Sequence, residues 1–324
     1  MLVPALIALA LPASASAQAT RTFVSGVGDD VNPCSRTAPC KTFAGAISKT
    51  AAGGIIMAMD DGGFGTLTIT KPLTVDGGHH SAGVLSSGGI NGINVNIDPA
   101  VQPANFVNNG RVVLKNLKIE GNTSIPSVGG FTPGLNGVRI LNAKSVKIIN
   151  SDIGFYSRSG VDVEPANGTP LIKVGVIDSF IHDNGGAGVL VAPPGTSAAR
   201  VSVRGNSLDD NGCGLVAARF GMNAAFNFAA DCATNAPNAV TATSVINAFD
   251  NDIADSSFRG ILARGNSSTI RIGRNSVTGT VGGPALGVLD GGFLLSYGNN
   301  LVTGNPGGDG TATGPITPAR VSPH

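Results

Sequence analysis

One short pattern recurs along this chain, and it limits the folds available more than any other property of the sequence. Each unit opens with a glycine and alternating apolar residues, passes a variable loop, and then carries two more short apolar stretches. The intervals between opening glycines are 23, 28, 26, 46 and 27 residues, and these glycines are Gly137, Gly160, Gly188, Gly214, Gly260 and Gly287. Repeats of about 20 to 50 residues indicate a solenoid.

The second and third stretches of each unit alternate between apolar and polar residues, as β-strands do. The second stretches are residues 146–148, 174–176, 201–203, 244–246 and 270–272. Apolar anchors of the third stretches are Ile153, Ile181, Leu208, Ile253, Val277 and Leu301. No unit has room for a helix of ten or more residues, as helical repeats require. The sequence therefore predicts three short strands per unit, stacked in a parallel coil whose units bury their apolar faces against neighbours.

Asparagine and aspartate occupy the bend between the second and third strands. They are Asn116, Asn150 and Asp178 and, one residue later in their units, Asn206, Asn251, Asn275 and Asn299. Both residue types tolerate left-handed backbone geometry and hydrogen-bond to nearby backbone, as a sharp corner requires. We therefore expect these residues to be structural and not catalytic.

This pattern resembles the right-handed parallel β-helix of pectate lyases and polygalacturonases, the pectin lyase-like superfamily. It is most similar to bacterial secreted proteins known only as right-handed β-helix repeat proteins, and residues 22–54 resemble their N-terminal signature. The resemblance covers about residues 22–302 and implies an all-β fold with three strands per coil. It implies little about activity, because this architecture supports unrelated chemistries.

Residues 1–19 have the features of a secretory signal peptide. An apolar segment at residues 2–11 precedes small residues that form cleavage sites, and the segment is too short for a membrane span. No other segment approaches the length of a membrane span. The sequence thus predicts a secreted or periplasmic protein.

The rest of the chain divides into a cap, a coil and a tail. Residues 20–53 are predicted to form an N-terminal cap with a short helix at 41–51, residues 54–302 the β-helix, and residues 303–324 a disordered tail. Four cysteines in an exported protein favour two disulfides. We pair Cys34 with Cys40 and Cys213 with Cys232, because each pair closes a local loop. Zinc is the alternative, but no histidine is near either pair.

Candidate site residues lie on the outer side of the first strands. If the first and third positions after each opening glycine point inward, the second points outward. This outward column contains Asn94, Arg139, Asp162, Leu190, Val216, Leu262 and Leu289, and the fourth position adds Asn96 and Glu164. We predict Arg139, Asp162 and Glu164 as catalytic residues and Asn94 and Asn96 as ligand-binding residues, because enzymes of the resembling families act on this face.

Two carboxylates beside a cation allow several chemistries. They can act as acid and base or hold calcium, while Arg139 neutralises a uronate. The alternative is a solvated ladder of ion pairs without a function. The motif sets of polygalacturonases are not reproduced, the chain has no Trp for the pectate lyase motif, and His79-His80, His182-Asp183 and Asp209-Asp210 are assigned to loops and turns.

The sequence therefore predicts a surface or polysaccharide-binding scaffold, whose partner is a polysaccharide or cell-surface glycan. The alternative is a polysaccharide lyase or glycoside hydrolase acting on a uronate-containing glycan at the outer face of the first strand. No cofactor is predicted, and calcium has no supporting motif. The 21 basic and 20 acidic residues give a net charge of +1, which offers no argument for nucleic acid.

The apolar part of the outward column requires a cover, since a continuous apolar stripe on a solvated sheet is unusual. One candidate is the insertion at residues 219–243, whose aromatic residues are Phe220, Phe226 and Phe228. A second copy of the chain is the other. The insertion is the preferred cover, because a disulfide from Cys213 to Cys232 would hold it beside Val216.

Overall fold

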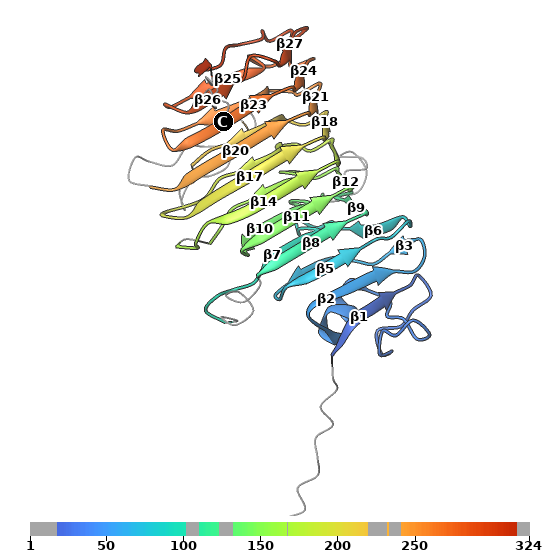
Figure 1. Ribbon diagram of the computed structural model, residues 1–324. Helices are drawn as coiled ribbons and strands as arrows, with labels where there is room; N and C mark the ends of the chain where they lie inside the picture. Colours follow the sequence, from blue (N-terminus) through green and yellow to red (C-terminus); the bar gives the residue numbers. More distant parts are fainter. Residues whose placement is uncertain are drawn as a thin grey trace, which may run out of the picture.

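The computed structural model describes residues 18–101, 110–122, 132–166, 168–219, 232 and 241–315. Within them the chain winds into a parallel β-helix, whose coils stack along one axis (Figure 1). Three all-parallel sheets form its sides, and each complete coil contributes one strand to each sheet. The fold class predicted from the sequence is therefore confirmed. Most of the predicted signal peptide, residues 1–17, lies outside the described residues.

In the described part of the chain, sheet A has eleven strands, sheet B nine and sheet C eight. Sheet A contains β1 (Ala19–Val24), β2 (Thr50–Ala58), β5 (Leu73–Asp76), β8 (Arg111–Lys115), β11 (Ser145–Ile149), β14 (Ile172–Ile177), β17 (Ala198–Arg204), β20 (Thr243–Phe249), β23 (Ser268–Gly273), β26 (Phe293–Ser296) and β28 (Gly314–Pro315). Sheet B contains β3 (Gly62–Gly63), β6 (Ala82–Leu85), β9 (Leu117–Glu120), β12 (Asp152–Gly154), β15 (Phe180–His182), β18 (Ser207–Asp209), β21 (Asp252–Ile253), β24 (Ser276–Val277) and β27 (Leu301–Val302). Sheet C contains β4 (Leu67–Ile69), β7 (Ile93–Asn96), β10 (Val138–Asn142), β13 (Val161–Val163), β16 (Ala187–Val191), β19 (Cys213–Ala217), β22 (Arg259–Arg264) and β25 (Leu286–Leu289).

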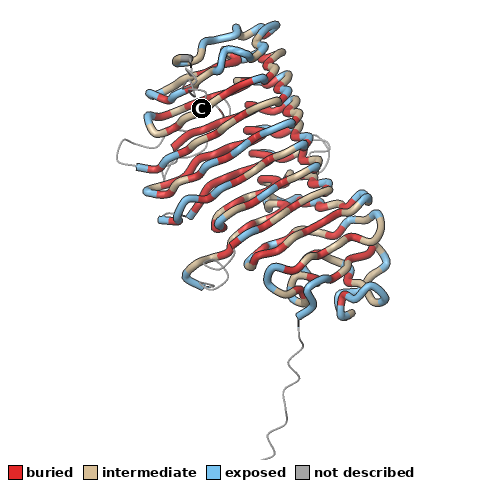
Figure 2. Tube along the Cα trace, viewed as in Figure 1, coloured by how far each residue is buried: buried red, intermediate tan, exposed pale blue. Residues whose placement is uncertain are grey.

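Alternating side chains fill one continuous core inside the coil, so that buried and exposed residues alternate along the strands of sheet A (Figure 2). The inward residues stack in register, as Val146 does on Val174. Two predicted positions shift within their units. Ile246 pairs with Val201, which moves the fourth triplet to residues 246–248. Val302, and not Leu301, pairs with the preceding anchor Val277.

A short helix closes the N-terminal end of the coil. Helix α1 (Phe43–Lys49) begins after Thr42, whose hydroxyl accepts a hydrogen bond from the backbone amide of Gly45. Its buried Phe43 packs against the ring of Phe64, with the centroids 5.1 Å apart. The helix thereby covers apolar core that has no neighbouring coil. No helix in the described ranges is long and apolar enough to cross a membrane.

The opposite end of the molecule extends beyond the predicted boundary at Val302. Strand β28 pairs with β26, and the backbone amide of Thr313 donates to the carbonyl of Leu294 at 2.7 Å. The start of the predicted disordered tail, residues 303–315, is therefore ordered against sheet A. Sequence reasoning missed it because the segment has no apolar period.

The corners between sheets A and B contain two structural features, a left-handed backbone residue and a ladder of side-chain amides, and the sequence predicted only the first. Asn116, Asn150 and Asp178 do have a positive φ, as expected. In later coils other residues take the left-handed position, namely Gly205, Asp250, Arg274 and Gly298. The asparagines that follow instead form a buried ladder of side-chain amides, consisting of Asn206, Asn251, Asn275 and, in place of the predicted Asn299, Asn300.

Candidate functional site

The predicted outward column exists on the outer face of sheet C. Its members pair with one another in the order Asn94, Arg139, Asp162, Leu190, Val216, Leu262 and Gly287. The last member corrects the prediction of Leu289, which pairs with Arg264. Because Leu262 pairs with Gly287, the final coil opens two residues earlier, at Ala285.

The structure brings the predicted catalytic residues together. Arg139 Nη2 donates to Glu164 Oε2 at 2.8 Å, and Arg139 Nε lies 3.7 Å from Asp162 Oδ2. A second cation, Arg158, lies with Nη2 3.6 Å from Glu164 Oε1. Sequence reasoning missed Arg158, because it precedes β13 in the chain and only the fold carries it to the cluster. We call these four residues the charged cluster.

The charged cluster is enclosed, which corrects the expectation of a solvated ladder. Asp162 is fully buried and Glu164 is 6% exposed. Burial, followed by the nearby Glu164 carboxylate, raises the pKa of Asp162 despite the opposing effect of the arginines. Burial also raises the pKa of Glu164, against the lowering effect of Arg139 and Arg158. Two carboxyl groups with raised pKa values can hold and exchange a proton.

The two predicted ligand-binding asparagines are engaged with other amides of the chain. Asn91 Nδ2 donates to Asn94 Oδ1 at 2.9 Å, and Asn142 Nδ2 donates to Asn96 Oδ1 at 2.7 Å. Asn94 pairs with Arg139 in the sheet, whereas Asn96 pairs with Asn142. Across the described ranges, no group of three or more His, Cys, Asp or Glu side chains is arranged to hold a metal ion.

The apolar part of the column is covered within a single chain. Leu190, Val216 and Leu262 are completely buried in a second apolar cluster outside the coil. Cys232 belongs to this cluster and is joined to Cys213, so the predicted disulfide holds part of the insertion against the stripe. The other predicted disulfide, Cys34–Cys40, is also present. Phe220, Phe226 and Phe228 lie outside the described residues.

A groove runs along the corner between sheets A and B, and sequence reasoning did not find it. Its volume is about 750 Å³. The left-handed corner residues of five successive coils line it, namely Gly78, Asn116, Asn150, Asp178 and Gly205. With strands about 4.8 Å apart, four steps between coils extend over roughly 19 Å. We call this site the corner groove.

Side chains of sheet B form one wall of the corner groove. They are Lys118 on β9, Asp152 on β12, and Phe180 and Ser207 on the next two strands. His79 and His80, which the sequence placed in a solvated loop, line the groove at one end. The exposed fraction of Phe180 is 41%, large for an aromatic side chain. The groove thus combines amides, hydroxyls and charges with one apolar platform.

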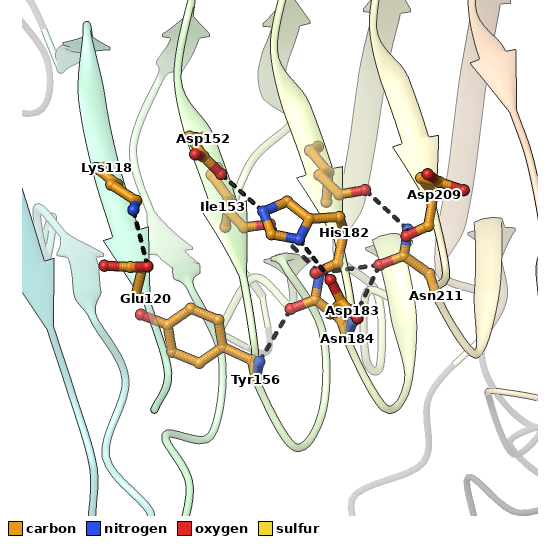
Figure 3. A network of polar contacts seen from close by, with 11 residues as sticks. Lys118, Glu120, Asp152, Ile153, Tyr156, His182, Asp183, Asn184, Asp209 and Asn211 are labelled. Atoms are coloured by element: carbon orange, nitrogen blue, oxygen red, sulfur yellow. Dashed lines mark hydrogen bonds and ion pairs between the residues drawn. The ribbon is translucent and has the colours of Figure 1, made fainter. Parts of the chain in front are cut away.

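His182 holds this platform in place, and Figure 3 shows the contacts of its imidazole with Asp152 and Asp183. The ring of Phe180 stacks on its imidazole, with centroids 4.2 Å apart and planes inclined by 16°. His182 Nε2 lies 2.8 Å from Asp152 Oδ1, and Nδ1 lies 2.7 Å from Asp183 Oδ2. Since each ring nitrogen faces a carboxylate, both nitrogens donate when the imidazole is protonated, and these contacts favour the cation. The close approach also requires a glycine, because a Cβ on Gly154 would lie 2.6 Å from the His182 ring.

The ionisation of His182 follows from these contacts. Burial alone lowers its pKa, but the hydrogen bonds that its ring donates to Asp152 and Asp183 outweigh burial and raise the pKa above its usual value. Asp183 does occupy a left-handed turn, as the sequence predicted, so only the role of His182 was missed. The signal available in the sequence was the alternation around each third-strand anchor, which puts the residues before and after the anchor, such as Phe180 and His182 around Ile181, on the outer face of sheet B.

Together these features define a class of protein, a three-sheet parallel β-helix with a polar groove along one corner. A scan against protein-family models and a search of curated proteins both found no match. Among solved structures, the chain is similar to the GH136 lacto-N-biosidase from Eubacterium ramulus.

The native form of that enzyme is 10% identical, with a TM-score of 0.39, and the alignment covers 92% of this chain and 67% of that one. Its selenomethionine derivative is 11% identical, with a TM-score of 0.33, and the alignment covers 87% and 67%. At these values the likeness carries no inference about function.

Proposed function

We propose that the protein is an exported scaffold that binds a glycan chain in the corner groove. The observation that carries this proposal is the groove itself, which crosses five coils and repeats similar corner groups along the axis. A linear polymer of sugars matches such a site, because each coil offers its groups about 4.8 Å from the previous coil.

The chemistry of the groove suits a sugar. A pyranose ring has a rim of hydroxyls and a flatter face of C–H groups. Asn116, Asn150 and Ser207 provide hydrogen-bonding groups for the rim, and the exposed ring of Phe180 provides an apolar surface for the face. Because His182 already stacks against one side of Phe180, the platform is held before a ligand arrives. Such preorganisation reduces the entropy lost on binding.

The two disulfides support export, because such bonds persist in oxidising compartments outside the cytosol. Glycans of cell surfaces and extracellular matrices are accessible in that environment.

Replacement of the platform tests the proposal. Phe180→Ala should weaken glycan binding about tenfold, as truncation of a central aromatic contact typically costs about 1.4 kcal/mol. Phe293→Ala is a matched control, because Phe293 is 44% exposed and lies on β26, outside the groove. Affinity for a panel of neutral and acidic glycans is measured by calorimetry. Equal binding by Phe180→Ala and the parent for every glycan that binds would refute the groove as the site.

Cleavage of a uronate-containing glycan is the second candidate function. The observation in its favour is the pair of carboxyl groups with raised pKa values in the charged cluster. In this scheme Asp162 acts as the acid, Glu164 as the base, and Arg139 neutralises the uronate. Their enclosure is the reason for placing binding ahead of cleavage.

Product analysis distinguishes the two candidates. The parent, Asp162→Asn and Glu164→Gln are incubated with uronate glycans, and new reducing ends and unsaturated products are measured. Cleavage by the parent that falls by orders of magnitude in both variants supports catalysis. The absence of products from the parent, or full activity of both variants, contradicts it.

A further inference from the structure

The outer face of sheet A carries a dense set of cations. Five of the six adjacent strands from β8 to β23 place seven Lys or Arg side chains on this face, and β20 carries none. We call them the basic face, and they are Arg111, Lys115, Lys147, Lys173, Arg200, Arg204 and Arg271. The residues next to these cations in each strand point inward and are buried, so the cations all project to the outer side of the sheet.

These cations have few acidic partners. None of the six strands contains an Asp or Glu residue. At the margins Lys115 pairs with Asp76 at 2.9 Å, and Arg204 lies 3.4 Å from Asp250. For the other five, no carboxylate of the described residues lies within ion-pair distance. The positive charge is therefore available to a ligand.

The adjoining sheet has the opposite sign. The outer positions of sheet B and the turns after them hold seven carboxylates, namely Glu120, Asp152, Asp183, Asp209, Asp210, Asp252 and Asp255. Burial and the neighbouring Asp210 and Asp255 carboxylates raise the pKa of Asp209. The net charge of +1 thus conceals two charged faces, and the composition argument made from the sequence did not detect them.

We propose that the basic face binds an acidic polysaccharide, a linear glycan carrying carboxylate or sulfate groups. The cations follow the axis of the coil, as where Lys173 pairs with Arg200 on the neighbouring strand. Adjacent strands repeat about every 4.8 Å, so the six strands extend over roughly 24 Å, and a chain laid along the axis meets cations from every strand except β20. Some outward residues between these cations have short side chains, such as Gly175 and Ser202, which lets the polymer lie close to the sheet.

The composition of the face favours a glycan over other polyanions. Single-stranded nucleic acids bind through aromatic rings interleaved with cations, and Phe249 at the margin is the single aromatic residue of these six strands. Peripheral membrane attachment combines basic residues with apolar side chains that enter the bilayer. The apolar residues on this face are half-buried between the cations, as Ile149 and Ile177 are.

The inference goes beyond the proposed function and is independent of it. None of the seven cations lines the corner groove. Loss of groove binding in Phe180→Ala would leave the basic face unaffected, and loss of the cations would leave the platform in place. Failure of one proposal is therefore distinguishable from failure of the other.

Removal of two adjacent cations tests the inference. The full chain is titrated with alginate, a polyuronate, and with neutral dextran at several salt concentrations. Lys173→Gln combined with Arg200→Gln should weaken alginate binding about 25-fold at low salt, since each cation near an anionic ligand contributes about fivefold. Arg36→Gln combined with Lys41→Gln removes two exposed cations of the N-terminal cap, outside sheet A, and should change binding less than about twofold.

The affinity of the parent for alginate should fall steeply as the salt concentration rises, and the parent should bind dextran more weakly than alginate. Equal effects of the two double variants, or binding insensitive to salt, would overturn the proposal. Tighter binding to oligothymidylate, or to vesicles of phosphatidylcholine with phosphatidylglycerol, would assign the face to nucleic acid or to membrane instead. Self-association that the Lys173 and Arg200 substitutions abolish would assign it to contact with the acidic face of a second copy.

Discussion

Replacement of one ladder asparagine should destabilise the protein far more than its position at a corner suggests. Asn251 Nδ2 donates to the carbonyl of Val203 at 2.9 Å and to Asn275 Oδ1 at 2.8 Å. Its Oδ1 accepts from the backbone amide of Asn206 at 3.0 Å and from the Asn206 side chain at 2.9 Å. Asn251→Ala removes all four contacts in a buried setting. At about 1 kcal/mol each, the free energy of unfolding falls by about 4 kcal/mol.

Thermal unfolding followed by circular dichroism measures this effect. For a domain of this size, a loss of about 4 kcal/mol lowers Tm by roughly 8 °C. Asn299→Ala is the control, because Asn299 is an exposed corner residue that accepts one hydrogen bond, from the backbone amide of Arg274. It should cost less than about 1 kcal/mol. Similar Tm values for the two variants would refute the distinction between ladder and corner asparagines.

Three further predictions follow from the polar and covalent contacts. The folded-state pKa of His182 is raised, so its ion pairs stabilise the fold below about pH 6.5, and this stabilisation is lost as the pH rises through the folded pKa. His182→Gln should therefore lower the free energy of unfolding by about 1 kcal/mol in acid and by less in alkali. The same difference between parent and variant in denaturant titrations at both pH values would contradict this. Replacing Cys213 and Cys232 by Ala removes a disulfide with a sequence separation of 19, which should lower the free energy of unfolding by about 3 kcal/mol and promote self-association in sedimentation. A stable monomer would show that the apolar stripe stays covered without the disulfide. The raised pKa of Asp162 means that its charged form is disfavoured in the fold, so Asp162→Asn should gain stability relative to the parent as the pH rises above about 4. A loss of stability relative to the parent in denaturant titrations would instead show a favourable buried ion pair.

Local patterns predicted the coil, because period and alternation depend on neighbouring residues alone. Val174 and Val176 point inward and stack on Val146 and Ile148 as the alternation requires. The same reasoning correctly placed Arg139 beside Asp162, since a parallel coil aligns equivalent positions of successive units. The cap helix and both disulfides also followed from local spacing.

Properties that depend on distant segments could not be predicted in this way. The enclosure of Asp162 depends on what packs over the outer face of sheet C, and alternation identifies only the side to which a residue points. The corner groove depends on left-handed residues stacking across five coils, so no single unit contains it. His182 lies in one unit and its partner Asp152 in the previous one. The sequence therefore indicated the turn at His182-Asp183 but not the contact between His182 and Asp152.

The account depends most on glycan binding at Phe180, and the absence of Trp from this chain allows a direct measurement. Phe180→Trp would place a single indole on the platform of the corner groove, and Phe293→Trp would place one on β26, outside it. Titration of Phe180→Trp with a binding glycan should give a saturable blue shift in emission, and Phe293→Trp should give no change. An unchanged spectrum from Phe180→Trp at saturating glycan, or equal shifts from both variants, would contradict binding in the groove.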